Sequence, residues 1–186
     1  MRKNLSSKAL LYPQPVLLLG TYDEHEVPDI MVAAWGSVSD YDKIFICLDK
    51  THKTTSNILL NKAFTVSIGV RKFVINEDYL GIVSANDEPN KVKKSSFTTT
   101  KSEFVNAPLI NELPLTLECE LISYDDEKEH LFGKIINVSV DESILKANGK
   151  IDVTKLDPII YDTSNHKYLS IGEVIGCAFK DGEKIK

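Results

Sequence analysis

The sequence predicts a mainly β fold: an antiparallel barrel, closed or nearly closed, with two or three helices packed outside it. The first observation is a series of short apolar runs at modest spacing, each bounded by turn residues. The second is that two pairs of runs flank short charged segments, at 23–26 and 125–129, as in antiparallel hairpins. The third is that no GxGxxG turn occurs, which argues against a dinucleotide-binding α/β domain.

The first half of the chain is expected to contain four strands and one helix. The strands are predicted over 16–22, 27–35, 44–48 and 64–70. Between the last two, Ile58, Leu59 and Leu60 predict the apolar face of a helix of about ten residues. Either Thr51 or Thr54 is expected to cap its N-terminus, because a hydroxyl can accept a bond from a free first-turn N–H.

The second half is expected to begin with a helix over 76–83, with Tyr79, Leu80 and Val83 facing inward. A polar loop over 86–96 follows, and its Lys91, Lys93 and Lys94 are interpreted as solvated. Long strands are predicted over 115–124 and 131–140, with a bulge or close approach at Gly133. Shorter pieces are expected as a turn over 143–147, a strand over 151–153 and extended segments over 158–161 and 168–171.

Composition restricts the classes of function. The 186 residues carry a net charge of -5, so a general affinity for nucleic acid is not expected. No apolar run approaches the ~20 residues of a membrane span, and the N-terminus lacks the apolar segment of a signal peptide. We expect one domain over 1–186, with 1–12 and 180–186 peripheral, and no membrane association.

The three cysteines and four histidines are scattered along the chain. Cys47, Cys119 and Cys177 each lie in an apolar run, and no CxxC pair or Cys-His cluster has zinc spacing. We interpret them as buried free thiols on strands, which favours a reducing, cytoplasmic compartment. No metal site is expected.

The turn at 49–57 offers more hydrogen-bond donors than any other short segment. It follows a predicted strand and opens a predicted helix, where free backbone N–H groups attract an anion. Hydroxyls beside Lys53 complete a phosphate cradle. The alternative interpretation is an ordinary polar strand-to-helix loop with a threonine cap.

Six short motifs occur one after another between residues 15 and 172. They are MVAAWGSVS at 31–39, H-x-T with Asn-Ile at 52–58, FTVS at 64–67, G-x-x-S at 81–84, LECEL at 117–121 and HLFGKI at 130–135. This combination resembles the flavin reductase-like family, and within it the flavoredoxin group. The resemblance implies an FMN-binding split β-barrel, antiparallel and of Greek-key type. It also implies a homodimer with one FMN per subunit near the interface.

By resemblance, the turn after the third strand holds the phosphate or ribityl part of FMN. Lys53 would screen the phosphate charge, hydroxyls of Thr51 and Thr54 would donate hydrogen bonds, and Asn57 would add an amide. The full set expected around this turn is Leu48, Asp49, Lys50, Thr51, His52, Lys53, Thr54 and Asn57.

The flavin ring is expected along residues 33–37, where the second strand of the first hairpin ends. The residues implied here are Ala33, Ala34, Trp35, Gly36 and Ser37, together with Ser84. Small alanines permit a close approach, and backbone N–H and C=O groups can pair with the pyrimidine edge of the ring. For Trp35 the alternative is an ordinary core position on a strand.

His130 is the candidate catalytic residue, near where a nicotinamide would dock. Hydride transfer needs close positioning of two carbons rather than a protein base, so His130 would orient the donor. The alternative is a solvated hairpin residue.

The implied activity is electron transfer between NAD(P)H and flavin, or between bound flavin and a redox protein partner. Two other classes remain open. One is a flavin- or haem-binding module on the same barrel without turnover. The other is an enzyme similar to pyridoxamine-phosphate oxidase, which Arg2 and Arg71, as the only arginines, disfavour.

Overall fold

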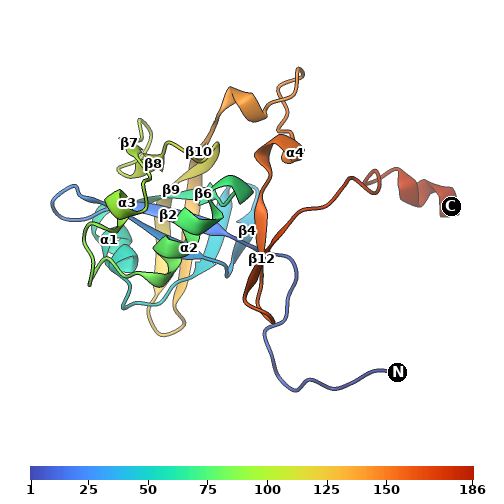
Figure 1. Ribbon diagram of the computed structural model, residues 1–186, viewed down its shortest axis with the longest axis horizontal. Coiled ribbons are helices and arrows are strands. Elements are labelled where there is room, and N and C mark those ends of the chain that lie inside the picture. Colours follow the sequence, from blue (N-terminus) through green and yellow to red (C-terminus); the bar gives the residue numbers. More distant parts are fainter.

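A seven-stranded antiparallel sheet organises the chain in the computed structural model, which describes residues 1–186 (Figure 1). Its strands are β2 (Leu17–Tyr22), β3 (Pro28–Ala33), β4 (Gly36–Asp40), β5 (Lys43–Cys47), β6 (Ala63–Ile68), β9 (Leu115–Asp125) and β10 (His130–Val140). They lie in the order β3-β2-β6-β9-β10-β5-β4, and the sheet curls into a half-barrel. Consequently β3 and β4 form its two edges. The prediction of a mainly β, antiparallel fold is confirmed.

Smaller elements surround this sheet. A three-stranded sheet contains β1 (Gln14–Pro15), β11 (Ile159–Asp162) and β12 (Lys167–Ser170), and a hairpin contains β7 (Thr99–Lys101) and β8 (Pro108–Ile110). The α-helices are α1 (Lys53–Asn61), α2 (Val74–Ile82), α3 (Lys91–Lys94) and α4 (Val153–Leu156). Three 3-10 helices are η1 (Arg71–Phe73), η2 (Glu142–Ile144) and η3 (Asp181–Ile185). None of the helices is long and apolar enough to cross a membrane.

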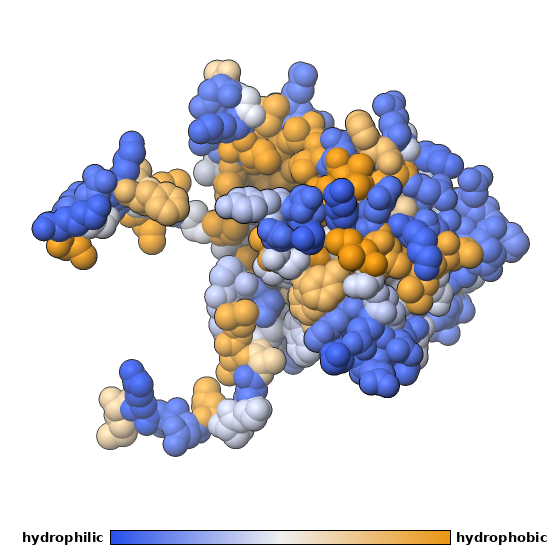
Figure 2. Space-filling view, turned by 180° about the vertical axis from the view of Figure 1, so that it is seen from behind, coloured by the Kyte–Doolittle hydropathy of each residue, from blue (hydrophilic) through white to orange (hydrophobic).

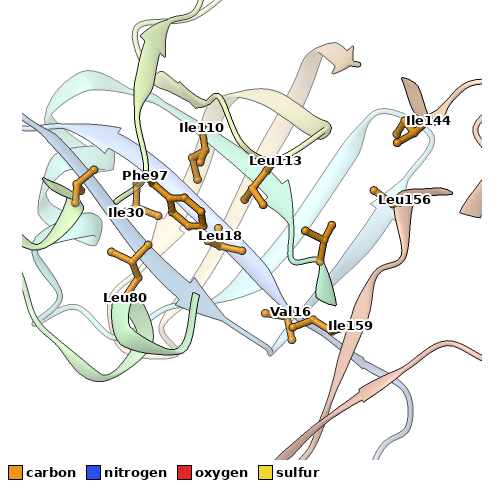
Figure 3. Packing of buried hydrophobic residues seen from close by; sticks show 12 residues of the cluster. Val16, Leu18, Ile30, Leu80, Phe97, Ile110, Leu113, Ile144, Leu156 and Ile159 are labelled. Atoms are coloured by element: carbon orange, nitrogen blue, oxygen red, sulfur yellow. The ribbon is translucent and has the colours of Figure 1, made fainter. Parts of the chain in front are cut away.

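Both faces of the interior strand β2 are buried, which explains its predominantly apolar sequence. Leu17 and Leu19 point into a cluster inside the curled sheet, beside Phe64. Leu18 points to the opposite face and packs in a second cluster with Ile30, Leu80, Phe97 and Ile110 (Figure 3). Side chains alternate across a strand, so a strand buried on both faces has no polar alternation.

The close approach expected at Gly133 is present, and the pairing of β9 with β10 shifts beside it, where Ile122 of β9 is the extra, unpaired residue. A Cβ atom at Gly133 would collide with the ring of Phe64. The glycine therefore lets this fully buried ring pack against β10.

The strand predicted over 27–35 is too long. It ends at Ala33, and a separate strand, β4, begins at Gly36. The sequence GSVSD has no apolar alternation because β4 is an exposed edge strand. Backbone pairing with β5 defines it rather than side-chain burial.

The predicted apolar face of α1 is also wrong in part. Ile58 is fully buried, but Leu59 and Leu60 are exposed. The buried face consists mainly of Thr54, Thr55 and Asn57, whose polar groups are hydrogen-bonded. Periodicity of apolar residues does not detect a face that is buried through satisfied polar groups.

Neither Thr51 nor Thr54 caps α1. The N-cap residue is His52, whose side chain makes no capping hydrogen bond. Thr51 donates its hydroxyl to Asp49, and Thr54 donates its hydroxyl to Asp29. Both hydroxyls therefore bond to carboxylates and leave the first-turn N–H groups of α1 without a side-chain cap.

Three further expectations need correction. The polar loop over 86–96 contains α3, in which Lys91 is buried rather than solvated. The strand expected over 151–153 is only an isolated bridge at Ile151, and α4 begins at Val153. Cys177 is exposed outside any strand, whereas Cys119 is buried on β9 as predicted. For Lys91 the deciding contact comes from Asp29, a residue far away in the sequence.

Glu77 on α2 is a buried carboxyl group with a 1% exposed side chain. Its Oε1 atom accepts a hydrogen bond from the backbone N–H of Val70 at 2.8 Å, whereas Oε2 has no partner. Burial disfavours the charged form and raises the pKa of Glu77 to about 7. The folded chain therefore holds a proton that the unfolded chain releases near pH 4.5.

We expect Glu77→Gln to remove a pH dependence of folding stability. Because the folded pKa is raised, the wild-type free energy of unfolding falls as pH rises from about 4.5 to about 7. The variant should match the wild type near pH 4.5 and exceed it by up to about 3 kcal/mol at pH 8. Urea unfolding over this range measures the difference, with exposed Glu103→Gln as the control. Equal pH slopes in both proteins would contradict the expectation.

Candidate functional site

A groove runs beside the edge strand β3, between the start of α1, the C-terminal half of α2 and the segment over 83–91. The helices that border it lie together on one side of the sheet (Figure 1). It encloses about 210 Å³. Its lining residues are Asp29, Met31, Val32, His52, Lys53, Thr54, Leu80, Gly81, Ile82, Val83, Ser84, Ala85 and Lys91.

The groove continues in both directions along β3. A cavity of about 220 Å³ adjoins it beside Asn86 and shares Asp29, Lys53 and Ala85 with it. A larger cavity of about 350 Å³ lies at the other end, beside Ala34, and shares Val32, Gly81 and Ile82. Together they reach the size of small-molecule sites, which typically begin near 300 Å³.

The N-terminus of α1 opens onto this groove. His52 and the first-turn residues Lys53 and Thr54 line it. The first turn contains no acidic residue and no side-chain cap. Unpaired first-turn N–H groups carry the positive end of the helix dipole. The Nζ atom of Lys53 adds a cation, which pairs with Glu24 at 3.0 Å in a partly exposed contact. This end of the groove therefore favours an anion.

A buried charge pair lies in the groove wall. Lys91 and Asp29 are 2% and 4% exposed, and their Nζ and Oδ1 atoms are 3.3 Å apart. Lys91 also donates to the carbonyl oxygen of Val83 at 3.0 Å, at the end of α2. The other oxygen of Asp29 accepts the Thr54 hydroxyl at 2.5 Å. The pair thus joins α3, β3, α2 and α1.

The Oδ1 atom of Asp29 is not fully satisfied by this pair. It lies near the ammonium group of Lys91 but forms no hydrogen bond with suitable angles. A buried acceptor without a hydrogen bond carries an energetic cost. Because Asp29 lines the groove, a ligand hydroxyl or N–H could satisfy it.

The structure brings together part of the residues predicted around the 49–57 turn. His52, Lys53 and Thr54 line the groove, together with Ser84. The others do not line it: Leu48, Asp49, Lys50, Thr51 and Asn57. Leu48 is a core residue, and Asn57 is buried and donates its amide to Thr21 at 3.1 Å.

Asp49 organises the turn itself. Its Oδ1 atom accepts hydrogen bonds from the backbone N–H and the hydroxyl of Thr51, both at 2.7 Å. These bonds hold the pKa of the Asp49 carboxyl below its ordinary value. Asn86 donates to the carbonyl oxygen of Thr51 at 3.2 Å and so ties the 83–91 segment to the turn. Lys50 is exposed on the same turn.

The residues predicted along the flavin ring are spread over two strands. Ala34 lines the 350 Å³ cavity, whereas Ala33 is buried against β2. Trp35 is 54% exposed at the corner between β3 and β4, so the interpretation as a core tryptophan is wrong. Gly36 and Ser37 lie on β4 and pair with β5. Ser84 and Ala34 are therefore the members of the predicted ring set that line the continuous groove.

His130 is separate from the groove. It begins β10 opposite Cys47 of β5, and its ring packs edge-on against Phe45 with centroids 5.0 Å apart. Its partly buried position also differs from the alternative of a solvated hairpin residue. No group of three or more His, Cys, Asp or Glu side chains could hold a metal ion.

Sequence reasoning missed several residues of the groove. Asp29, Val32 and Lys91 line it together with apolar residues at the end of α2. Asp29 could have been noticed, because PDIMVA places a charge within an apolar strand. Lys91 gave no comparable signal, since it occurs in a polar stretch with two other lysines.

Comparison with known proteins identifies the family. A model described as "Flavin reductase like domain" matches residues 9–179. The chain belongs to the flavin reductase-like family. This confirms the resemblance inferred from the sequence motifs.

Solved structures give the same result at the level of fold. Flavoredoxin of Desulfovibrio vulgaris (Miyazaki F) is 36% identical, with a TM-score of 0.93 over 98% of this chain and 100% of that one. Flavoredoxin from Methanosarcina acetivorans is 29% identical, with a TM-score of 0.86 over 100% of this chain and 98% of the other. An FMN-binding domain of a flavin reductase-like enzyme from Shewanella baltica shares the fold at 18% identity, with a TM-score of 0.79 over 88% and 89% of the two chains. The predicted split barrel is therefore confirmed.

A curated relative from Aquifex aeolicus is described as an uncharacterized protein and is 31% identical over 137 residues. The matched region covers 72% of this chain and 64% of that relative, so this flavin reductase-like chain matches less than two thirds of it.

We expect Lys91→Met to destabilise the fold by about 3–5 kcal/mol, because it leaves the Asp29 carboxylate buried without its cation. Lys93→Met, an exposed change on the same short helix, should alter the free energy of unfolding by less than about 0.5 kcal/mol. Urea unfolding compares the two variants. The double variant Asp29→Asn/Lys91→Met should recover part of the loss, and equal effects of Lys91→Met and Lys93→Met would contradict this.

Proposed function

We propose that the groove along β3 binds FMN and that the protein is an oxidoreductase passing electrons between a reduced donor and this flavin. One observation carries the proposal: the uncapped N-terminus of α1, with Lys53, lies at a groove of mixed polar and apolar lining that follows an open sheet edge. An anion-binding end, joined to a groove that becomes more apolar toward Ala34, fits a molecule with a phosphate at one end and an aromatic ring at the other. Membership of the flavin reductase-like family supports the same assignment.

The phosphate is proposed to lie at the start of α1. FMN carries close to two negative charges there, and Lys53 can exchange its exposed contact with Glu24 for the phosphate. The first-turn N–H groups supply further donors. Thr54 has a different role from the expected one, because its hydroxyl already donates to Asp29. It therefore positions Asp29 instead of donating to the phosphate.

The ring is proposed to lie along β3. As an edge strand, β3 leaves backbone N–H and C=O groups on its outer side without a strand partner. These groups can pair with the donors and acceptors of the pyrimidine edge, and Val32 and Ile82 provide apolar walls. Asp29 can accept a bond from a ribityl hydroxyl, and Lys91 favours negative charge in the groove. Bound FMN would supply the electron-accepting chemistry that no side chain here provides.

A flavin that stays bound is the version we favour, with a redox protein or NAD(P)H as the donor. Support comes from the flavoredoxin of Desulfovibrio vulgaris, which is similar over 98% of this chain. His130 is left outside the proposed site because it does not line the groove. We also propose a homodimer, as the resemblance implies, in a reducing cytoplasmic compartment that suits three free cysteines.

An absorbance spectrum of the freshly purified protein tests this function. We expect a yellow protein that keeps its colour through gel filtration and releases a compound with the mass of FMN. Anaerobic mixing with NADH, NADPH or a reduced ferredoxin should bleach the bound flavin with at least one donor. Flavin that none of them bleaches would favour a binding module without turnover. A colourless protein that shows no binding of added FMN in calorimetry would reject the proposal.

We expect Lys53→Met to weaken FMN binding at least about tenfold, because it removes the cation beside the phosphate. Lys50→Met serves as the control, since Lys50 is an exposed lysine on the same turn that does not line the groove. Calorimetric titration of FMN into the flavin-free proteins gives both affinities. Equal dissociation constants in the two variants would place the phosphate elsewhere.

A further inference from the structure

Two tyrosines that have no role in the proposed function line the cavity of about 350 Å³ beside Ala34. Tyr161 on β11 and Tyr168 on β12 lie opposite each other in that hairpin, and their ring centroids are 6.0 Å apart. Val32 and Ile82 line both this cavity and the groove. The two tyrosines therefore border the part of the groove in which the flavin ring is proposed to lie.

The hydroxyl of Tyr168 is already committed to a partner. It donates to the Oδ1 atom of Asp78 on α2 at 2.8 Å. Burial, together with this bond and the charge of Asp78, raises the pKa of the Tyr168 hydroxyl above its ordinary value, so the group keeps its proton. A phenol has one proton to donate. Tyr168 therefore forms an aromatic wall of the cavity and has no donor left for a ligand.

The hydroxyl of Tyr161 has a partner whose role depends on protonation. Its oxygen lies 2.7 Å from the Nδ1 atom of His166, and it makes no other hydrogen bond. A neutral imidazole with its proton on Nε2 accepts the hydroxyl through Nδ1, whereas a protonated imidazole donates from both nitrogens. Protonation of His166 therefore reverses the bond: the Nδ1–H group donates to the Tyr161 oxygen, and the phenol proton needs a new acceptor.

His166 can exchange protons with water because it is exposed in the turn between β11 and β12. The last residues of the chain, which follow β12, lead away from the body rather than back over it (Figures 1 and 2). An imidazole ordinarily changes its charge between pH 5 and 8. One end of the Tyr161–His166 pair thus meets solvent, while both residues line the cavity.

The charged groups around His166 come from three segments of the chain. Asp162 of β11 and Lys167 of β12 lie opposite each other in the hairpin, and Tyr12 of the N-terminal segment donates its hydroxyl to Asp162 at 2.6 Å. Asp78 of α2 lines the cavity, where its carboxylate accepts the Tyr168 hydroxyl and forms no ion pair. A neutral His166 therefore leaves one negative charge at this end of the groove, and a protonated His166 balances it.

We propose that Tyr161 and His166 act together as a protonation-controlled hydrogen-bond donor to the flavin ring, and that this pair favours the reduced ring. The inference rests on the proposed function and adds two positioning residues to it. Reduction increases the negative charge on the ring, and hydrogen bonds to a charged acceptor are the stronger ones. Protonated His166 releases the Tyr161 hydroxyl for such an acceptor, and its own positive charge attracts the reduced ring.

Redox titration of the FMN-loaded protein at pH 6 and pH 8, followed by flavin absorbance, tests this proposal. At pH 6 we expect Tyr161→Phe and His166→Asn to lower the equilibrium constant of two-electron reduction at least about fivefold, which is ~20 mV. At pH 8, where the wild-type imidazole is neutral, the change should stay below about twofold. Asparagine is chosen because it tolerates the left-handed backbone of His166, at a φ of 51°.

Tyr41→Phe and His25→Asn are the matched controls, because both residues are exposed and line none of the three cavities. They should follow the wild type at both pH values. Glu77, with a pKa of about 7, titrates in the same range in every variant. The difference between a variant and the wild type at one pH is therefore the measure, rather than the slope of the wild type.

Calorimetric titration of oxidised FMN at pH 8 separates positioning from structural support. Each variant should bind within about twofold of the wild type, because neutral His166 keeps the Tyr161 hydroxyl to itself. A tenfold loss of this affinity in both variants would contradict the proposal. Wild-type potentials in both variants at pH 6 would overturn it and leave the flavin site intact. A wild-type chain that takes up no FMN would instead reject the proposed function, and the inference with it.

Discussion

The buried ammonium group of Lys91 is the interaction on which the groove depends. It meets Asp29 on β3 and the last carbonyl groups of α2, while Asp29 in turn holds Thr54 at the start of α1. Four elements, α1, α2, α3 and β3, therefore meet at one charge pair. Burying such a pair costs solvation energy that its mutual attraction does not always repay. Its value here lies in fixing the positions of the groove walls.

The edge position of β3 explains why the groove lies there. An interior strand has partners on both sides, but β3 pairs only with β2. Its outer backbone groups remain available, and α1 and α2 border the same edge without closing it. An open strand edge is a liability for aggregation unless something covers it. A bound planar ligand would use these groups and at the same time protect the edge.

Family membership and the geometry of the groove give different kinds of information about this protein. The family match covers residues 9–179 and establishes the fold and the flavin reductase-like class. The groove adds what a family match does not contain, namely which residues of this chain face one another.

The sequence by itself determined the family and the main strands, because local pattern defines both. β2, β9 and β10 are recognisable from apolar runs and turn residues, and Gly133 indicates a close approach in advance. The turn before α1 likewise pointed to His52, Lys53 and Thr54, which do line the groove. These features depend on neighbours along the chain.

Only the tertiary structure decided the positions that depend on partners far away in the sequence. Lys91 looks solvated in KVKK until Asp29, 62 residues earlier, supplies its counter-charge. Thr54 and Asn57 form a buried helix face because Asp29 and Thr21 satisfy them. His130 resembles a site residue by motif, yet pairing of β10 with β5 places it opposite Cys47. A polar group can be buried without a large cost in free energy only when a hydrogen-bond or charge partner faces it, and the fold decides which residue that partner is.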